Sequence, residues 1–202
     1  VFEAPVIEAW DPSVLRTIVP VGSVWKFADE GPAPPASWRS GSFDDSAWKS
    51  GPAPLGYGDD WVLTAVSFGD DSEAKRITTH FRRSFTVDTP EELAELRIRL
   101  RRDDGAIVYV NGVEVTRDNM PPESDSETPA IMAASGPAEE WYFPHSIPTK
   151  VLRKGVNVIA VEIHQSGGSS SDLSFDLALE GRARRAPNTA EAITSVTIDE
   201  SH

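Results

Sequence analysis

The sequence contains no cysteine among its 202 residues. Disulfides, thiolate nucleophiles, zinc–thiolate sites and iron–sulfur clusters are therefore excluded. Long apolar runs are also lacking, so no segment has the pattern of a transmembrane helix. The histidines are few and scattered, at positions 80, 145, 164 and 202, and they form no His-Glu-x-x-His motif or close pair. The sequence therefore gives no sign of a metal-dependent hydrolase site within this chain.

Positive charge is scarce as well. The chain has 19 lysine and arginine residues against 32 aspartates and glutamates, a net charge of −13. Such an acidic surface repels phosphate backbones, so we expect no nucleic-acid partner, and it suits neutral ligands and cations. A second interpretation is that the acidity only keeps a secreted protein soluble.

Helical periodicity is rare, and what the sequence has instead is alternation. Residues 76–87 alternate apolar and polar side chains, which predicts a half-buried strand with His80 and Arg82 on its polar side. Asn111-Gly112 joins two strands as a tight hairpin, because both central residues of that turn need a positive φ. Further strands are predicted at residues 95–102, 157–165 and 172–181. Short strands with connections rich in glycine and proline predict an all-β fold, an antiparallel β-sandwich.

The predicted organisation has three parts. Residues 1–17 are a lead-in segment, residues 18–181 form the sandwich, and residues 182–202 are a linker followed by the start of another segment. Because the chain starts at Val1 and its last strand-like segment looks unfinished, we expect it to be a fragment of a longer protein.

Three stretches resemble a known family. "SFDDSAWKSGPAPLGYG", "DDGAIVYVNGVEV" and "LRKGVNVIAVEIHQ" are similar to the Asp-Asp-Ser-x-Trp segment, the Val-Asn-Gly hairpin and the Gly-x-Asn-x-Ile-Ala-Val strand of the sugar-binding jelly-roll domain of family 2 glycoside hydrolases. That domain belongs to the galactose-binding-like class of β-sandwiches. Over residues 18–181 the chain also resembles a module of large secreted bacterial proteins, where it accompanies phosphoesterase and carbohydrate-active regions. The resemblance implies a jelly-roll topology and leaves the function open.

The same resemblance raises the question of a structural calcium ion. Galactose-binding-like domains often hold calcium where an early loop meets the last strand, and calcium takes six to eight oxygen ligands. Here Asp44, Asp45, Asp176 and Glu180 are the candidate ligands, although the Asp-Gly-Asn loop of calcium-bearing relatives is missing. The alternative is that Asp44 and Ser46 only fasten a turn, with Trp48 as its anchor.

Two kinds of residue are candidates for ligand binding. Aromatic side chains in loops can stack on sugar rings, which singles out Tyr57, Trp61, Trp141 and Tyr142; each could instead cover an end of the core. Asp103 and Asp104 are adjacent carboxylates at a strand end. One of them could bind a ligand, or the pair could form a turn next to Arg101 or Arg102.

A third set surrounds the polar loop "HQSGGSSSD". His164, Gln165 and Asp172 flank small residues that leave room for a ligand. A His–Asp pair beside a serine run would resemble two-thirds of a catalytic triad, but no Gly-x-Ser-x-Gly elbow accompanies it. We therefore predict no catalytic residues.

These observations predict a non-catalytic accessory module of a secreted or cell-surface bacterial protein. Its expected partners are a glycan or cell-surface polysaccharide and neighbouring domains of the same polypeptide. The alternatives are a structural spacer that packs against a catalytic domain and, less favoured, a hydrolase in its own right.

Overall fold

Two β-sheets face each other in the computed structural model, which describes residues 2–5 and 14–184. Sheet 1 has the order β10-β7-β12-β4-β5, with β1 also paired to β12. Its strands are β1 Leu15–Val19, β4 Leu55–Tyr57, β5 Thr64–Ala65, β7 Leu93–Asp103, β10 Phe143–Ile147 and β12 Leu173–Ala183. Every pairing in sheet 1 is antiparallel except that of β4 with β5.

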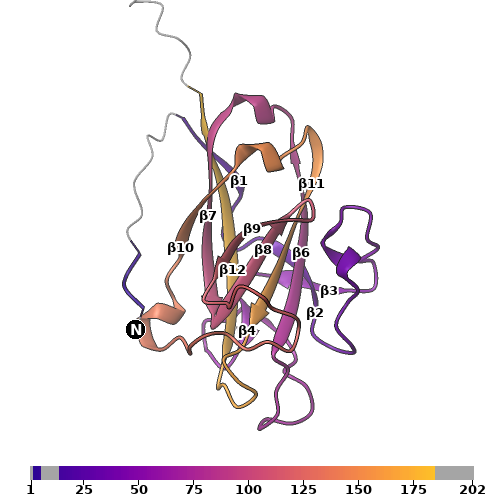
Figure 1. Ribbon diagram of the computed structural model, residues 1–202, viewed down its shortest axis with the longest axis vertical. Coiled ribbons are helices and arrows are strands. Elements are labelled where there is room, and N and C mark those ends of the chain that lie inside the picture. Colours follow the sequence, from indigo (N-terminus) through magenta and orange to yellow (C-terminus); the bar gives the residue numbers. More distant parts are fainter. Residues whose placement is uncertain (1, 6–13, 185–202) are drawn as a thin grey trace, which may run out of the picture.

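Sheet 2 has the order β3-β2-β6-β11-β8-β9, and all of its pairings are antiparallel. Its strands are β2 Val24–Ala28, β3 Lys49–Pro52, β6 Thr78–Val87, β8 Gly105–Val110, β9 Val113–Asp118 and β11 Gly155–His164. The long strands of both sheets run along the long axis of the molecule (Figure 1). The predicted antiparallel β-sandwich is confirmed, whereas its jelly-roll type stays a prediction.

Helical structure in the described part of the chain is limited to short 3₁₀ turns, η1 Ala36–Arg39, η2 Pro90–Glu92, η3 Gly136–Glu139 and η4 Thr149–Val151. None of the helices in the described segments is long and apolar enough to cross a membrane. The turn η2 leads directly into β7.

The main core fills the space between the sheets. Alternate residues of each strand point inward, so Leu96, Ile98 and Leu100 of β7 join Leu173, Phe175, Leu177 and Leu179 of β12. Phe175 is at the centre: its ring centroid lies 4.4 Å from that of Phe81 and 4.9 Å from that of Trp25. Asn111 and Gly112 have φ angles of 52° and 84°, which confirms the predicted hairpin.

The outer face of sheet 2 differs from the prediction of a half-buried strand. His80 and Arg82 point away from the main core, yet they are only 5% and 2% exposed. The connection between β2 and β3 folds over this face and packs Trp38, which is 1% exposed, against His80 at a centroid distance of 4.9 Å. Arg82 donates hydrogen bonds to the Trp38 carbonyl and to Asp45. The alternation was read correctly, but the covering loop could not be foreseen.

The predicted division of the chain into a lead-in segment, a sandwich and a linker stays a prediction. Strand β1 begins at Leu15, slightly before the predicted start at residue 18, and β12 continues to Ala183, slightly beyond residue 181. Most of the predicted lead-in and nearly all of the predicted linker lie outside the described residues.

Candidate functional site

Five carboxylates gather where several strands of the sandwich end. Strand β12 begins at the lower end in Figure 1, and antiparallel pairing brings it beside the end of β4 and the end of β7. The residues contributed by these strand ends and their loops are Asp59 after β4, Asp103 and Asp104 at the end of β7, Glu139 in η3 and Asp172 before β12. We call this group the acidic end.

Two glycines allow the loop after β4 to lie against the start of β12. A Cβ on Gly56 would stand 1.8 Å from the Leu173 carbonyl oxygen. Gly58 has a φ of 95°, and a Cβ there would lie 2.6 Å from the Cβ of Asp172. Because only glycine fits such close backbone approaches, the sequence "LGYGD" places Asp59 next to Asp172.

Three of the carboxylates face one another. Asp59, Glu139 and Asp172 each offer an oxygen, and the three oxygens lie within 4.8 Å of one another. Partial burial and then the negative charge of Asp172 raise the pKa of Asp59 and the pKa of Glu139. No ion pair joins the three to a basic side chain within the described segments. The local charge is therefore strongly negative and largely uncompensated.

Asp103 and Asp104 lie beneath this group and have different environments. Asp104 is 1% exposed, and its two oxygens accept backbone N–H bonds from Ala134 and Ser166, both at 2.6 Å. Asp103 is also 1% exposed, and its Oδ2 has no hydrogen-bond partner. Burial, a hydrogen bond with Asp104 and the charges of Asp104, Asp172 and Glu139 raise the pKa of Asp103 to about 9.

A buried amide and a phenol complete the floor of the acidic end. Gln165 Nε2 donates to the Tyr57 hydroxyl at 2.7 Å and to the Asp172 carbonyl oxygen at 2.8 Å. Since that carbonyl can only accept, the orientation of the amide is fixed. Gln165 Oε1 is buried and has no partner. Two buried oxygens of the floor, Gln165 Oε1 and Asp103 Oδ2, thus have no hydrogen-bond partner.

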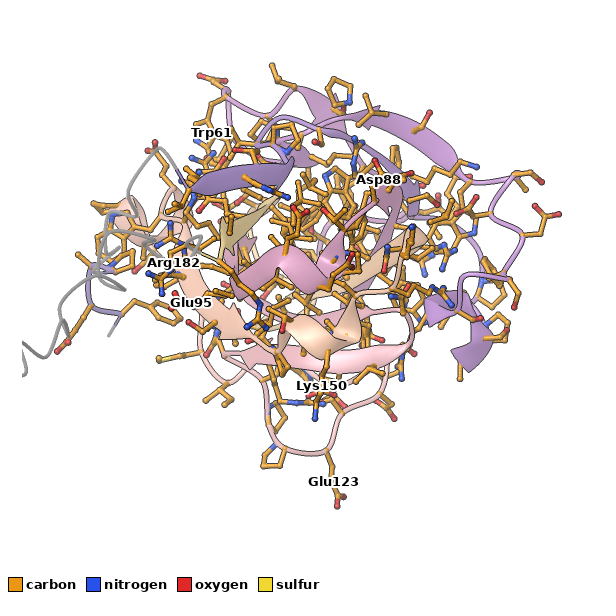
Figure 2. All side chains as sticks on the ribbon, turned by 90° about the horizontal axis from the view of Figure 1, so that it is seen from above. Trp61, Asp88, Glu95, Glu123, Lys150 and Arg182 are labelled. Atoms are coloured by element: carbon orange, nitrogen blue, oxygen red, sulfur yellow. The ribbon has the colours of Figure 1, made fainter. Side chains whose placement is uncertain are left out.

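Aromatic rings border the acidic end on the outer face of sheet 1. The Arg101 guanidinium lies 4.6 Å from the centroid of the Trp61 ring and 4.8 Å from that of Tyr142, distances typical of cation–π contacts. The Tyr142 hydroxyl donates to Asp176 at 2.7 Å. Trp61 is half-buried and lies at the periphery of the molecule (Figure 2). The two rings and the guanidinium form a stack, the Trp61–Arg101–Tyr142 stack, beside the carboxylates.

The structure therefore brings together most of the residues predicted to bind a ligand, namely Tyr57, Trp61, Asp103, Asp104, Tyr142, Gln165 and Asp172. Trp141 packs edge-on against Phe143 at 6.2 Å. His164 points to the outer face of sheet 2, where Nδ1 lies 2.9 Å from both Thr78 Oγ1 and the Thr128 carbonyl oxygen. Its Nε2 faces Glu162 at 3.2 Å, so the partners of His164 do not include Asp172.

The four carboxylates predicted to bind calcium are not brought together. Asp45 bonds to Lys26 and Arg82 over sheet 2, and Asp44 accepts the Ser46 N–H at 3.0 Å, as the turn interpretation predicted.

The other two are on sheet 1. Asp176 accepts bonds from Tyr142 and from the Gly22 N–H, and Glu180 is paired with Arg97 and Arg99. Each of the four carboxylates therefore has hydrogen-bond or ion-pair partners of its own.

Sequence reasoning missed Asp59, Glu139 and Arg101 as members of the site. Asp59 and Glu139 lie two residues from Trp61 and Trp141, which were candidates for ligand binding, and Arg101 was considered only as a neighbour of a turn at Asp103 and Asp104. Their convergence depends on loop packing across sheet 1, which no local pattern encodes.

Hollows also open elsewhere on the surface. One of about 340 Å³ lies under the connection between β2 and β3, lined by Phe43, Trp48 and prolines, and one of about 370 Å³ lies over Arg82 and Asp45. In the first, Asp29 pairs with Lys49, and in the second the single carboxylate, Asp45, pairs with both Lys26 and Arg82. The acidic end is the stronger candidate because its oxygens remain available.

Comparison with known proteins gives a fold and no family. No family model and no curated protein matches the chain. Among solved structures, a β-glucuronidase from Ruminococcus gnavus has a TM-score of 0.55 and 13% identity over 90% of this chain and 32% of its own. A β-glucuronidase from an uncultured Clostridium species has a TM-score of 0.53 and 15% identity over 89% of this chain and 31% of its own. β-Glucuronidase 2 from Bacteroides uniformis has a TM-score of 0.52 and 22% identity over 83% of this chain and 18% of its own.

The chain therefore spans a third or less of the length of these enzymes. A further match is described as a β-glucuronidase of glycoside hydrolase family 2. The chain thus has the β-sandwich fold of one part of such glycoside hydrolases.

Proposed function

We propose that this chain is a non-catalytic accessory module that binds neutral carbohydrate within a larger secreted bacterial protein. The observation that carries the proposal is the Trp61–Arg101–Tyr142 stack beside Asp59, Glu139 and Asp172. Aromatic faces contact the C–H groups of sugar rings, and carboxylate oxygens accept bonds from sugar hydroxyls.

The charge of the site favours a neutral glycan over an acidic one. The Arg101 charge lowers the pKa of Asp59, but burial and the charges of nearby carboxylates have the larger effect and raise it. A uronic acid or phosphate would meet the repulsion of several carboxylates. The neighbouring structures are named as β-glucuronidases, so the host polypeptide of this module is proposed to act on glycans through a separate domain.

Binding rather than hydrolysis is proposed because three of the carboxylates converge on one point. A glycosidase places two carboxyl groups about 5 to 9.5 Å apart across the bond it cleaves. Asp59, Glu139 and Asp172 converge on one point, within 4.8 Å. That arrangement suits hydrogen bonding to a ligand or coordination of a cation. It differs from two carboxyl groups that lie on opposite sides of a glycosidic bond.

The proposal is tested with a glycan array followed by calorimetry on the 202-residue chain, wild type and Trp61→Ala. Removing a stacking ring at the centre of a site costs about 2 kcal/mol, a loss of about 30-fold in affinity. Trp48→Ala is the matched control, since Trp48 is a half-buried ring over sheet 2, and it is expected to keep full affinity. If no neutral oligosaccharide binds at millimolar concentration, or if the two variants bind equally, the proposal fails.

A second candidate function is a spacer that packs against a neighbouring domain. It is favoured by apolar side chains on the surface: Leu63 is 68% exposed, Ile131 is 65% exposed and Val24 is 53% exposed. If this is the main role, a Leu63→Ser or Ile131→Ser variant of the longer polypeptide loses thermal stability. In that case the wild-type chain and Trp61→Ala both bind no glycan.

A further inference from the structure

We propose that the hollow over β2 and β6 binds an oxyanion, which is a carboxylate, sulfate or phosphate group. The hollow has a volume of about 370 Å³, and the cations Lys26, Arg82 and Arg83 are among the residues that line it. Asp45 is the single carboxylate of the lining. The lining therefore carries a net charge of +2, whereas the whole chain carries −13. A hollow of this charge attracts the anions that the rest of the surface repels.

The hollow opens where two paired strands part. The register of β2 with β6 ends at the pair Lys26 and Arg82, although β2 begins at Val24 and β6 continues to Val87. Arg83 is the next residue of β6, and its guanidinium donates a hydrogen bond to the Val24 carbonyl oxygen beyond the end of the shared ladder. The divergence of the strands therefore leaves a third cation beside Lys26 and Arg82.

The Arg83 charge has no protein counterion. None of the ion pairs within residues 2–5 and 14–184 includes Arg83. Its Nε is buried without a hydrogen-bond partner, although a guanidinium has five N–H donors to place. Burial lowers the pKa of Arg83, and no carboxylate offsets this effect. Because buried charges are normally paired, the Arg83 charge favours a bound anion.

Asp45 fixes the other two cations in place. Arg82 is 2% exposed, and its Nε donates to Asp45 Oδ2 at 2.9 Å. Lys26 Nζ donates to Asp45 Oδ1 at 2.7 Å and to the Asp45 carbonyl oxygen at 2.9 Å. One carboxylate thus orients two cations but neutralises a single charge. The exposed hydroxyl groups of Ser50 and Ser84 add hydrogen-bond donors at the rim.

The class of ligand follows from these donors. Guanidinium, ammonium and hydroxyl groups together suit a group that is negatively charged and accepts several hydrogen bonds, as carboxylates, sulfates and phosphates do. Among the described residues that line the hollow none is aromatic, so a neutral sugar gains no stacking there. The inference goes beyond the proposed function, because this hollow lies over sheet 2 and takes a ligand of opposite preference to that of the acidic end.

The test is a two-dimensional ¹H–¹⁵N NMR titration of the 202-residue chain with sodium sulfate, sodium phosphate and sodium glucuronate. Each is compared with sodium chloride at a constant ionic strength of about 0.1 M, where the Debye length is about 10 Å and distant carboxylates are largely screened. Saturable shifts are expected at the amides of Val24, Lys26 and Ser84, with a dissociation constant of about 1 mM, because partly exposed ion contacts are weak.

The three salts also distinguish the source of the oxyanion. Tighter binding of glucuronate than of sulfate, with no shifts from neutral glucose, would assign the hollow to acidic saccharides. The reverse order would assign it to inorganic or esterified sulfate and phosphate. Either order supports an oxyanion site.

Charge variants at an exposed position test the site without disturbing the core. Ser84→Asp and Lys26→Gln are each expected to weaken sulfate binding by at least about 5-fold, and Ser84→Lys is expected to strengthen it by about 3-fold. A gain of affinity cannot result from partial unfolding. The matched control is Ser135→Asp, which makes the same charge change at an exposed serine just before η3, beside sheet 1, and is expected to bind sulfate as wild type does.

Three results would overturn the inference. The first is oxyanion-induced shifts no larger than those from chloride, and the second is equal sulfate affinity in Ser84→Asp, wild type and Ser84→Lys. The third is a loss in Ser135→Asp as large as that in Ser84→Asp. Trp61→Ala is expected to keep sulfate binding, so a failure of glycan binding at the acidic end leaves this inference intact, and a failure of sulfate binding leaves the proposed function intact.

Discussion

Replacing Trp38 by alanine removes the ring that closes the outer face of sheet 2. Trp38 is 1% exposed, and its ring lies 4.9 Å from that of His80 and 6.1 Å from that of Tyr109. A buried tryptophan covers about 200 Å², and about 25 cal/mol per Å² gives a transfer free energy of about 5 kcal/mol. Aromatic-to-alanine substitutions in cores cost about 3 to 5 kcal/mol. We expect Trp38→Ala to lower the free energy of unfolding by about 4 kcal/mol.

Urea denaturation followed by far-UV circular dichroism measures this loss. The matched variant is Trp61→Ala, because Trp61 is half-buried and rests on Arg101 at the surface, and a change within about 1 kcal/mol is expected there. An equal slope of free energy against urea would show that the denatured state is unchanged. If Trp38→Ala costs less than about 1 kcal/mol, the second core over sheet 2 does not contribute as argued. If the two variants cost the same, the division between structural and ligand-facing tryptophans is wrong.

Three other perturbations test separate parts of the fold. Burial lowers the pKa of His80 from 6.5 to about 4, so between these pH values the unfolded chain takes up a proton that the folded chain excludes. The free energy of unfolding should therefore fall by about 3 kcal/mol as the pH drops from 6.5 to 4, and urea titrations at both pH values should show a smaller fall for His80→Gln. Asp118→Ala leaves Arg102, which is 0% exposed, without its 2.9 Å partner, and thermal and urea denaturation should show a loss of about 3 to 5 kcal/mol, whereas a loss under about 1 kcal/mol would indicate that water compensates the charge. Gly56→Ala would bring a Cβ to 1.8 Å from the Leu173 carbonyl oxygen, so we expect no soluble folded protein by size-exclusion chromatography, and a native elution profile would show that β4 can move away from β12.

Much of the architecture was readable because strands leave a period of two in the sequence. The alternation of residues 76–87 predicted β6. Asn111-Gly112 predicted the hairpin between β8 and β9, with the correct positive φ angles. The inward faces followed from the same rule. What alternation does not show is a second layer. His80 and Arg82 looked solvent-facing, and only the fold of a loop carrying Trp38 makes them buried.

The candidate site was predictable in part for a similar reason. Tyr57, Gln165 and Asp172 flank turn-rich loops, and antiparallel pairing brings those loops to one end. Glu139 was missed because its segment has no periodic pattern. His164 was grouped with Asp172 on proximity in sequence, but strand parity turns its ring toward Thr78 on the outer face of sheet 2.

The most direct test of glycan binding at the acidic end is a two-dimensional ¹H–¹⁵N NMR titration of the 202-residue chain with a neutral oligosaccharide that scores on the array. The account predicts that the Trp61 indole N–H signal and the backbone amides around Asp59, Glu139 and Asp172 shift together, while the Trp38 indole signal does not. Shifts centred on Trp48 and the hollow under the β2–β3 connection, or no shifts at millimolar sugar, would contradict it.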